Sequence, residues 1–143
     1  MKRLVRILIV LLVAVSCGTA RQLHSAVDQV WACSQSHPEG FTLSLRTMEQ
    51  PIEGIAVAYS EGGIVLASLP GRGDRKPLKG VVRHALSHDG YVGGWTDGQT
   101  GAYCLDSVRL FPEDSLQAAL AFARAHAQKA VYVLSSDKEI GLK

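Results

Sequence analysis

The stretch from Tyr91 to Phe111, YVGGWTDGQTGAYCLDSVRLF, sets the fold expected for this chain. Two runs rich in aromatic and aliphatic residues, Tyr91–Trp95 and Ala102–Phe111, flank the turn-forming segment Asp97–Gly101. Two such runs around a short connection that contains glycine predict a β-hairpin. In the second run the alternation of apolar residues changes phase at Asp106-Ser107. This phase change predicts a β-bulge, a feature that is frequent beside functional sites.

Helices are predicted on both sides of this hairpin. Before it, Pro77 opens a segment with an apolar stripe at helical spacing, and Gly90 is placed to end that helix. After it, Pro112 and two acidic residues open a second helix. The run Ala130–Leu134 then reads as a strand in the interior of a sheet, because it is apolar on both faces.

The region before residue 77 predicts two further strands. Phe41–Leu45 alternates as a half-buried strand does, and Ile55–Tyr59 follows it after a break, so a long-looped hairpin is the simplest pairing. Ile64–Leu69 is expected to be a strand or a flap, and residues 25–34 favour a short additional helix. The order β-β-α-β-β-α-β predicts a single α+β domain over residues 37–143, with two principal helices on a mainly antiparallel sheet.

The N-terminus has the three parts of a secretory signal. Lys2, Arg3 and Arg6 precede the apolar run Ile7–Val15, which is shorter than the roughly 20 residues that span a bilayer. Residues 14–17, Ala-Val-Ser-Cys, resemble the bacterial lipobox, whose cysteine is diacylated and becomes the mature N-terminus. The interpretation is a signal peptide over residues 1–16, a lipidated Cys17, a lipid-anchored segment over residues 17–36 and a place in the bacterial cell envelope. An ordinary cleaved signal is the alternative.

Charge bears on the partners of the mature chain. Removal of residues 1–16 leaves 127 of the 143 residues, enough for one domain with a hydrophobic core. It takes away three of the 15 Lys and Arg residues and none of the 13 Asp and Glu residues, so the formal charge becomes −1. A nucleic-acid partner therefore has no support from charge. The expected partners are a membrane, through the lipid anchor, and an unidentified protein or small ligand.

Two other cysteines remain in the mature chain. Cys33 and Cys104 could form one disulfide in an oxidising envelope. They could equally remain free thiols, because their spacing in the sequence does not determine whether they meet in space.

Four residues are candidates for catalysis. His84 and His88 stand at i and i+4 on the first predicted helix, where two imidazoles could ligate a metal or act as acid and base. No third ligand accompanies them, so no metal is expected. Arg109 and Tyr103 could supply the cation and the hydroxyl that a metal-independent ribonuclease uses beside a histidine. The favoured interpretation is nevertheless that these residues are structural or solvated, and no motif for a cofactor is present.

An ordered set of short motifs resembles a small α+β domain of bacterial and phage proteins. The motifs are HPEGFT at residues 37–42, GIAVA at 54–58, YVGGW at 91–95, Tyr103 with Asp106, and QKAVY at 128–132 with Glu139-Ile140. The resemblance covers roughly residues 37–140 and implies the α+β fold but no settled activity. Members often lie at the ends of phage structural proteins or in small exported proteins, and some domains in comparable positions are suspected nucleases.

Two functions follow as hypotheses. The favoured one is an envelope lipoprotein whose domain is a non-enzymatic binding or interaction module. The alternative is a small metal-independent hydrolase of the nuclease type. A nuclease is expected to bring histidine, arginine and a hydroxyl together in a cleft, whereas a binding module is expected to carry an apolar or aromatic patch.

Overall fold

The computed structural model describes the backbone of residues 2–142 and the side chains of residues 19–142. The predicted signal peptide and the predicted lipidated Cys17 lie outside the residues whose side chains are described. The elements are α1 (Lys2–Ser36), β1 (Gly40–Ser44), β2 (Ile55–Ala58), β3 (Ile64–Leu66), η1 (Arg72–Asp74), α2 (Arg75–Ser87), β4 (Tyr91–Thr96), β5 (Tyr103–Phe111), η2 (Glu113–Ser115), α3 (Leu116–Ala125), β6 (Ala130–Val133) and β7 (Lys138–Gly141). Within the described residues, these form the α+β fold that the sequence predicts, with three α-helices and a seven-stranded antiparallel sheet.

The predicted hairpin is the centre of the sheet. β4 and β5 pair without interruption from Tyr91 opposite Val108 to Thr96 opposite Tyr103. Their turn is closed by the Asp97 N–H, which donates to the Ala102 carbonyl over 2.8 Å. The strand order is β1-β4-β5-β2-β6-β7, and β3 also pairs with β5. β6 lies between β2 and β7, which confirms the prediction of an interior strand over Ala130–Leu134.

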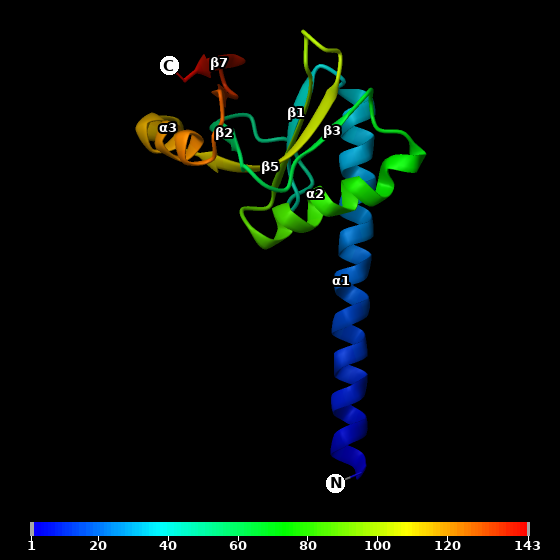
Figure 1. The fold of residues 1–143 in the computed structure, drawn as a ribbon. Helices are drawn as coiled ribbons and strands as arrows, with labels where there is room; N and C mark the ends of the chain where they lie inside the picture. Colours follow the sequence, from blue (N-terminus) through cyan, green and yellow to red (C-terminus); the bar gives the residue numbers. More distant parts are fainter. Residues whose placement is uncertain (1, 143) are drawn as a thin grey trace.

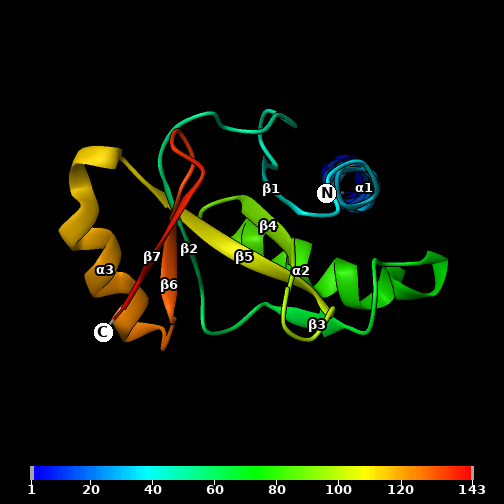
Figure 2. The same cartoon turned by 90° about the horizontal axis from the view of Figure 1, so that it is seen from above.

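The predicted pairing of the first two strands is wrong. β1 pairs with β4, whereas β2 pairs with β5 and β6, so the two strands lie on opposite sides of the central hairpin. Residues 45–54 carry the chain from one side of the hairpin to the other (Figure 2). A connection of this length costs little more closure entropy than a short hairpin loop, because the cost of closing a loop grows only slowly with its length. β1 therefore occupies the outer edge of β4, while β2 and β3 share the outer edge of β5.

The bulge predicted in β5 lies on the neighbouring segment instead. From Ala58 to Ile64 the chain advances six residues, while their partners on β5 advance only three, from Val108 to Leu105. Ser107 closes this insertion, because its carbonyl accepts from the Tyr59 N–H and its own N–H donates to the Gly62 carbonyl. Ser107 and Val108 are adjacent in β5, so their side chains face opposite sides of the sheet, and both are buried. Burial on both faces at this point explains why the alternation of apolar residues changes phase in the sequence.

The helices α2 and α3 and the last turns of α1 pack against the sheet (Figures 1 and 2). α2 ends as predicted, because Gly90 takes a φ of 80° and its N–H donates to the Ala85 carbonyl over 2.8 Å. In Figure 2, α2 and α3 lie at different ends of β5, so they cover separate parts of the sheet.

The hydrophobic core has two parts, which we call the larger and the smaller cluster. The larger cluster consists of buried residues of α1, α2, β1, β4 and β5, with Leu45 after β1: Ala26, Val27, Val30, Cys33, Phe41, Leu43, Leu45, Leu78, Val81, Val82, Ala85, Val92, Tyr103 and Leu105. The smaller cluster consists of Ile55, Val57, Phe111, Ala119, Ala123 and Val131. The core thus extends into residues 17–36, which the sequence separates from the domain.

Among the described residues, no helix is long and apolar enough to cross a membrane.

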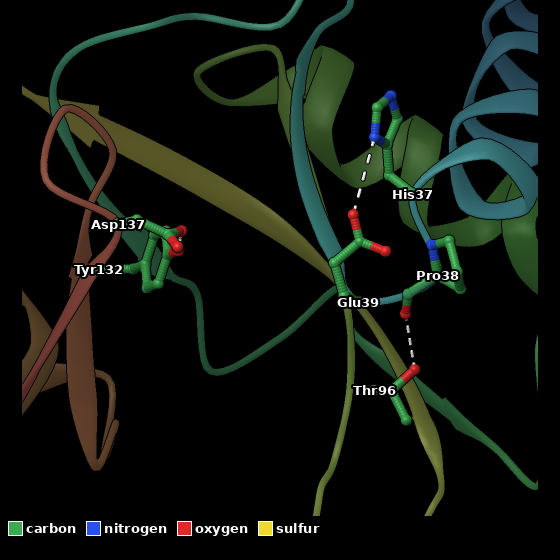
Figure 3. Close-up of polar contacts among 6 residues, drawn as sticks. All are labelled: His37, Pro38, Glu39, Thr96, Tyr132 and Asp137. Atoms are coloured by element: carbon green, nitrogen blue, oxygen red, sulfur yellow. Dashed lines mark hydrogen bonds and ion pairs between the residues drawn. The ribbon is translucent and has the colours of Figure 1, made fainter.

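Polar contacts fix two ends of the sheet (Figure 3). The Thr96 hydroxyl at the end of β4 donates to the Pro38 carbonyl over 2.6 Å, and His37 lies 3.9 Å from the Glu39 carboxylate. At the turn between β6 and β7 the Tyr132 hydroxyl donates to the Asp137 carboxylate. The first contact ties the end of the central hairpin to the connection between α1 and β1.

Candidate functional site

The two predicted histidines lie together at the C-terminal end of α2. The imidazole rings of His84 and His88 are stacked, with centroids 3.8 Å apart and planes 11° from parallel. His88 follows the last residue of the helix, and its Nδ1–H donates to the His84 carbonyl over 2.7 Å. A neutral His88 therefore presents Nε2 as a free acceptor.

Tyr59 joins this pair to α3. Its ring centroid lies 5.4 Å from that of His84 and 4.9 Å from that of His88. On the other side it lies 5.1 Å from Phe122 and 5.1 Å from His126, two residues of α3 and its C-terminal end. Tyr59 is one of the inserted residues opposite β5, so the bulge brings this ring between the two helices. We call Tyr59, His84, His88, Asp89, Arg109, Phe122 and His126 the histidine seam.

The absence of a side chain at Gly62 leaves room for the imidazole of His84. A Cβ at Gly62 would overlap the imidazole of His84, and the φ of 76° at this position favours glycine. The Nδ1 atom of His84 is buried and has no hydrogen-bond partner within the described residues. Burial, and then the nearby His88, lower the pKa of His84, while Glu61 opposes the shift. His84 is therefore neutral at pH 7.

The Tyr59 hydroxyl is committed to Asp89. It donates a hydrogen bond to the Asp89 carboxylate. Burial, followed by this hydrogen bond and the Asp89 charge, raises the pKa of Tyr59 to about 12, and Arg109 opposes the shift. Tyr59 thus keeps its proton at neutral pH and is a poor acid or nucleophile there.

The α3 side of the seam is held by backbone contacts. The ring of His126 lies 4.1 Å from that of Phe122, and its Nδ1 accepts a hydrogen bond from the Ser60 N–H over 3.1 Å. A neutral His126 therefore carries its proton on Nε2. The Gln128 amide donates to the carbonyls of Tyr59 and His126, which fastens the inserted segment to the end of α3.

Arg109 supplies the positive charge of the seam. It is an exposed residue of β5, and its guanidinium carbon lies 4.9 Å from the ring centroid of Phe111 and 5.3 Å from that of Phe122. Among the residues whose side chains are described, no carboxylate forms an ion pair with it. Aromatic rings position this guanidinium, while its charge remains available to a ligand.

Tyr103 does not belong to the seam. Its side chain is fully buried in the larger cluster, and a Cβ at Gly94 would meet its hydroxyl. Burial raises the pKa of this hydroxyl, which has no hydrogen-bond partner within residues 19–142. The structure therefore does not bring Tyr103 together with His84, and the hydroxyl-bearing side chain beside His84 is that of Tyr59.

The stacked histidines are poorly arranged for a metal. A ligating nitrogen points its lone pair within the plane of its ring, so two parallel stacked rings cannot both direct a lone pair at one ion between them. Within the described part of the chain, no group of three or more His, Cys, Asp or Glu residues is placed to hold a metal ion.

The two cysteines are free thiols. Cys33 is buried in the larger cluster, on the side of the sheet that the helices cover, and burial raises its pKa. Cys104 pairs with Trp95 and Val65 at strand positions that face away from the buried Tyr103 and Leu105. The sheet therefore separates the two thiols, and the disulfide alternative is not the one adopted.

Several residues of the histidine seam are not predicted from the sequence. Phe122 and His126 repeat the i, i+4 spacing of His84 and His88, and that spacing is the signal that could have identified them. Asp89 lies beyond the end of α2 at Ser87, so helical spacing from His84 does not identify it. Tyr59 carries no local signal, because only the insertion opposite β5 brings it to the helices.

Comparison of the chain with protein-family models, with curated proteins and with solved structures finds no match in any of the three.

Proposed function

We propose that this protein is a non-enzymatic binding module of the bacterial cell envelope that holds an anionic group at the histidine seam. The observation that carries the proposal is the guanidinium of Arg109, which two aromatic rings position and no carboxylate in the described residues neutralises. A planar guanidinium suits the paired oxygens of a carboxylate or a phosphate.

The imidazole of His126 adds a hydrogen-bond donor for an anion to the seam. A neutral His126 carries a proton on Nε2, since its Nδ1 accepts from the Ser60 N–H. Asp89 is already engaged by Tyr59, which limits its repulsion of an incoming anion.

Binding fits the seam better than catalysis does. The Tyr59 hydroxyl keeps its proton, because its pKa is raised to about 12. The Nδ1 atom of His84 is buried, so it is closed to a substrate. The two groups best placed to move protons are thus occupied with holding α2 and α3 together.

The test is calorimetric titration with inorganic pyrophosphate at one fixed pH near neutrality. Arg109→Ala should weaken binding about tenfold or more, as expected for loss of a charge-assisted hydrogen bond. Arg72→Ala is the matched control, because it removes an exposed arginine just before the opposite end of α2. Equal affinity of the two variants would exclude the seam as the anion site.

The envelope location is part of the same proposal and rests on the lipobox-like residues 14–17. Cells that express the chain are labelled with a palmitate analogue, and wild type is compared with Cys17→Ala. Label should appear in the wild type alone, because the variant lacks the Cys17 thiol to which the acyl chain would be attached. Equal labelling would reject the anchor while leaving the anion site open.

A metal-independent hydrolase is the second candidate, favoured by the free Nε2 of His88 and by the cation Arg109, each of which lies near Tyr59. It predicts cleavage of RNA in the presence of EDTA that is lost in His88→Gln and in Arg109→Ala. Pyrophosphate binding without RNA cleavage would leave the binding module as the function.

A further inference from the structure

The sheet carries an exposed apolar row on the face turned away from the buried side chains of the larger cluster. Val65 of β3, Cys104 of β5 and Trp95 of β4 are direct neighbours across three strands. Val65 is 71% exposed and Trp95 is 45% exposed. Contiguous exposed apolar side chains are a feature of interaction sites, and this row is where the described part of the sheet presents them.

Asp106 lies beside this row, two residues along β5 from Cys104. Its neighbour on β4 is Gly93, and on its other side a Cβ at Gly63 would overlap its carboxylate. The side chain is half-buried, and its Oδ2 accepts a hydrogen bond from the Trp95 indole N–H over 3.4 Å. Asp106 therefore occupies a notch with glycine on both flanks and the indole at its rim.

The charge of this carboxylate is not balanced. Among the described residues, no lysine, arginine or histidine forms an ion pair with Asp106. Burial raises the pKa of Asp106, and the indole hydrogen bond opposes the shift only in part. Burial, followed by the charges of Asp106 and of a second acid, Asp97, raises the pKa of Cys104, so Asp97 also lies near this site. A partly desolvated anion without a counterion favours a cation.

We propose that Trp95 and Asp106 form a binding site for one basic side chain, arginine or lysine, of a partner peptide. The face of tryptophan is the best aromatic surface for a cation, and the adjacent carboxylate supplies the opposite charge. The site lies apart from the histidine seam, so it stands or falls independently of the proposed function.

The backbone around the site is fixed in advance. The hydroxyl of Thr96, which follows Trp95, donates a hydrogen bond to the Pro38 carbonyl (Figure 3). Trp95 itself pairs with Gly40 of β1 on one side and with Cys104 of β5 on the other. A strand held on both sides loses little freedom when a ligand binds, which favours affinity.

The experiment is an NMR titration of the full ¹⁵N-labelled chain. The indole N–H of Trp95 is followed and is distinguished from that of Trp31, the other tryptophan, by the variant Trp95→Phe. The probes are acetyl-Gly-Arg-Gly-amide and acetyl-Gly-Lys-Gly-amide, with acetyl-Gly-Gln-Gly-amide as the neutral control. The two basic peptides should shift the Trp95 signal saturably, whereas the glutamine peptide should not.

The variants separate charge from shape. Asp106→Asn should weaken binding of the arginine peptide about tenfold, while Asp97→Asn, which removes a neighbouring acid of the turn, should change it less than threefold. Gly63→Ala keeps the charge and fills the notch, so it should weaken binding as well, and the amide spectrum of each variant reports folding directly. Equal binding of all three peptides would overturn the proposal in favour of an apolar patch. A Trp95 shift that follows protein concentration alone would overturn it in favour of self-association.

Discussion

The two hydrophobic clusters differ in how their helices are buried. In the larger cluster α2 contributes Leu78, Val81 and Val82, each at most 2% exposed, and α1 adds further buried residues. In the smaller cluster the fully buried residues of α3 are two alanines, while its leucines and Phe122 are only partly buried. Since burial of apolar area is the main source of stability, α3 is held less strongly than α2. The histidine seam is then more than a ligand site, because Tyr59 links the weaker helix to the stronger one.

The most severe test of this difference is Val131→Asp. Val131 is 1% exposed on interior strand β6, so an unpaired carboxylate there costs several kcal/mol. We expect the smaller cluster to lose its packing, and circular dichroism during urea unfolding shows whether the larger cluster follows. A melting curve identical to that of the wild type would contradict the buried position of β6.

Truncation of one leucine in each cluster sharpens the comparison. Leu105→Ala in the larger cluster should lower the free energy of unfolding by about 2–5 kcal/mol, because it leaves a cavity at a fully buried position. Leu120→Ala in the partly buried stripe of α3 should cost about 1–2 kcal/mol, since solvent or neighbouring side chains can fill the space. Urea titrations of both variants measure the two costs, and equal values would remove the distinction between the clusters.

The link between the helices is tested by Tyr59→Phe. This variant leaves the half-buried Asp89 without its donor and should cost about 1–3 kcal/mol. Tyr132→Phe is the matched control, because it also removes a tyrosine–aspartate hydrogen bond, but at the exposed turn between β6 and β7. Thermal melts should separate the two variants, and a cost no larger at Tyr59 than at Tyr132 would speak against the seam as a link.

The smallest expected effect concerns pH. Because the pKa of His84 is lowered in the folded state, the unfolded chain binds the proton more readily. The stability that neutral His84 contributes is present above the ordinary pKa of about 6.5 and is lost as the pH falls toward the lower folded value. The melting temperature of the wild type should therefore fall more between pH 7.5 and pH 5 than that of His84→Gln. His24→Gln, which alters an exposed histidine of α1, should behave as the wild type does.

The sequence predicts those parts of the fold that depend on neighbouring residues. The β4–β5 hairpin, the end of α2 at Gly90 and the interior position of β6 follow from turn residues and local periodicity. The partner of β1 does not follow, because strand pairing depends on which edge is free after the hairpin has formed.

The same distinction holds for the candidate site. His84 and His88 are found because they are one helical turn apart. Tyr59 and His126 are separated from them by long stretches of chain, and only the inserted residues opposite β5 and the packing of α3 bring them together. A periodic pattern describes neighbouring residues only, so it does not predict contacts between segments that are distant in the sequence.

The continuity of α1 has a mechanical consequence. The helix is unbroken from Thr19 through Ala26, the first buried residue of the larger cluster, to Ser36. The stretch from Thr19 to Ala26 rises roughly 10 Å at about 1.5 Å per residue. A helix does not bend freely as a Gly/Ser-rich linker does, so a force applied near residue 19 reaches the core as a rotation of the whole domain. If residue 17 carries the lipid, this part of α1 sets both the height and the tilt of the sheet above the bilayer.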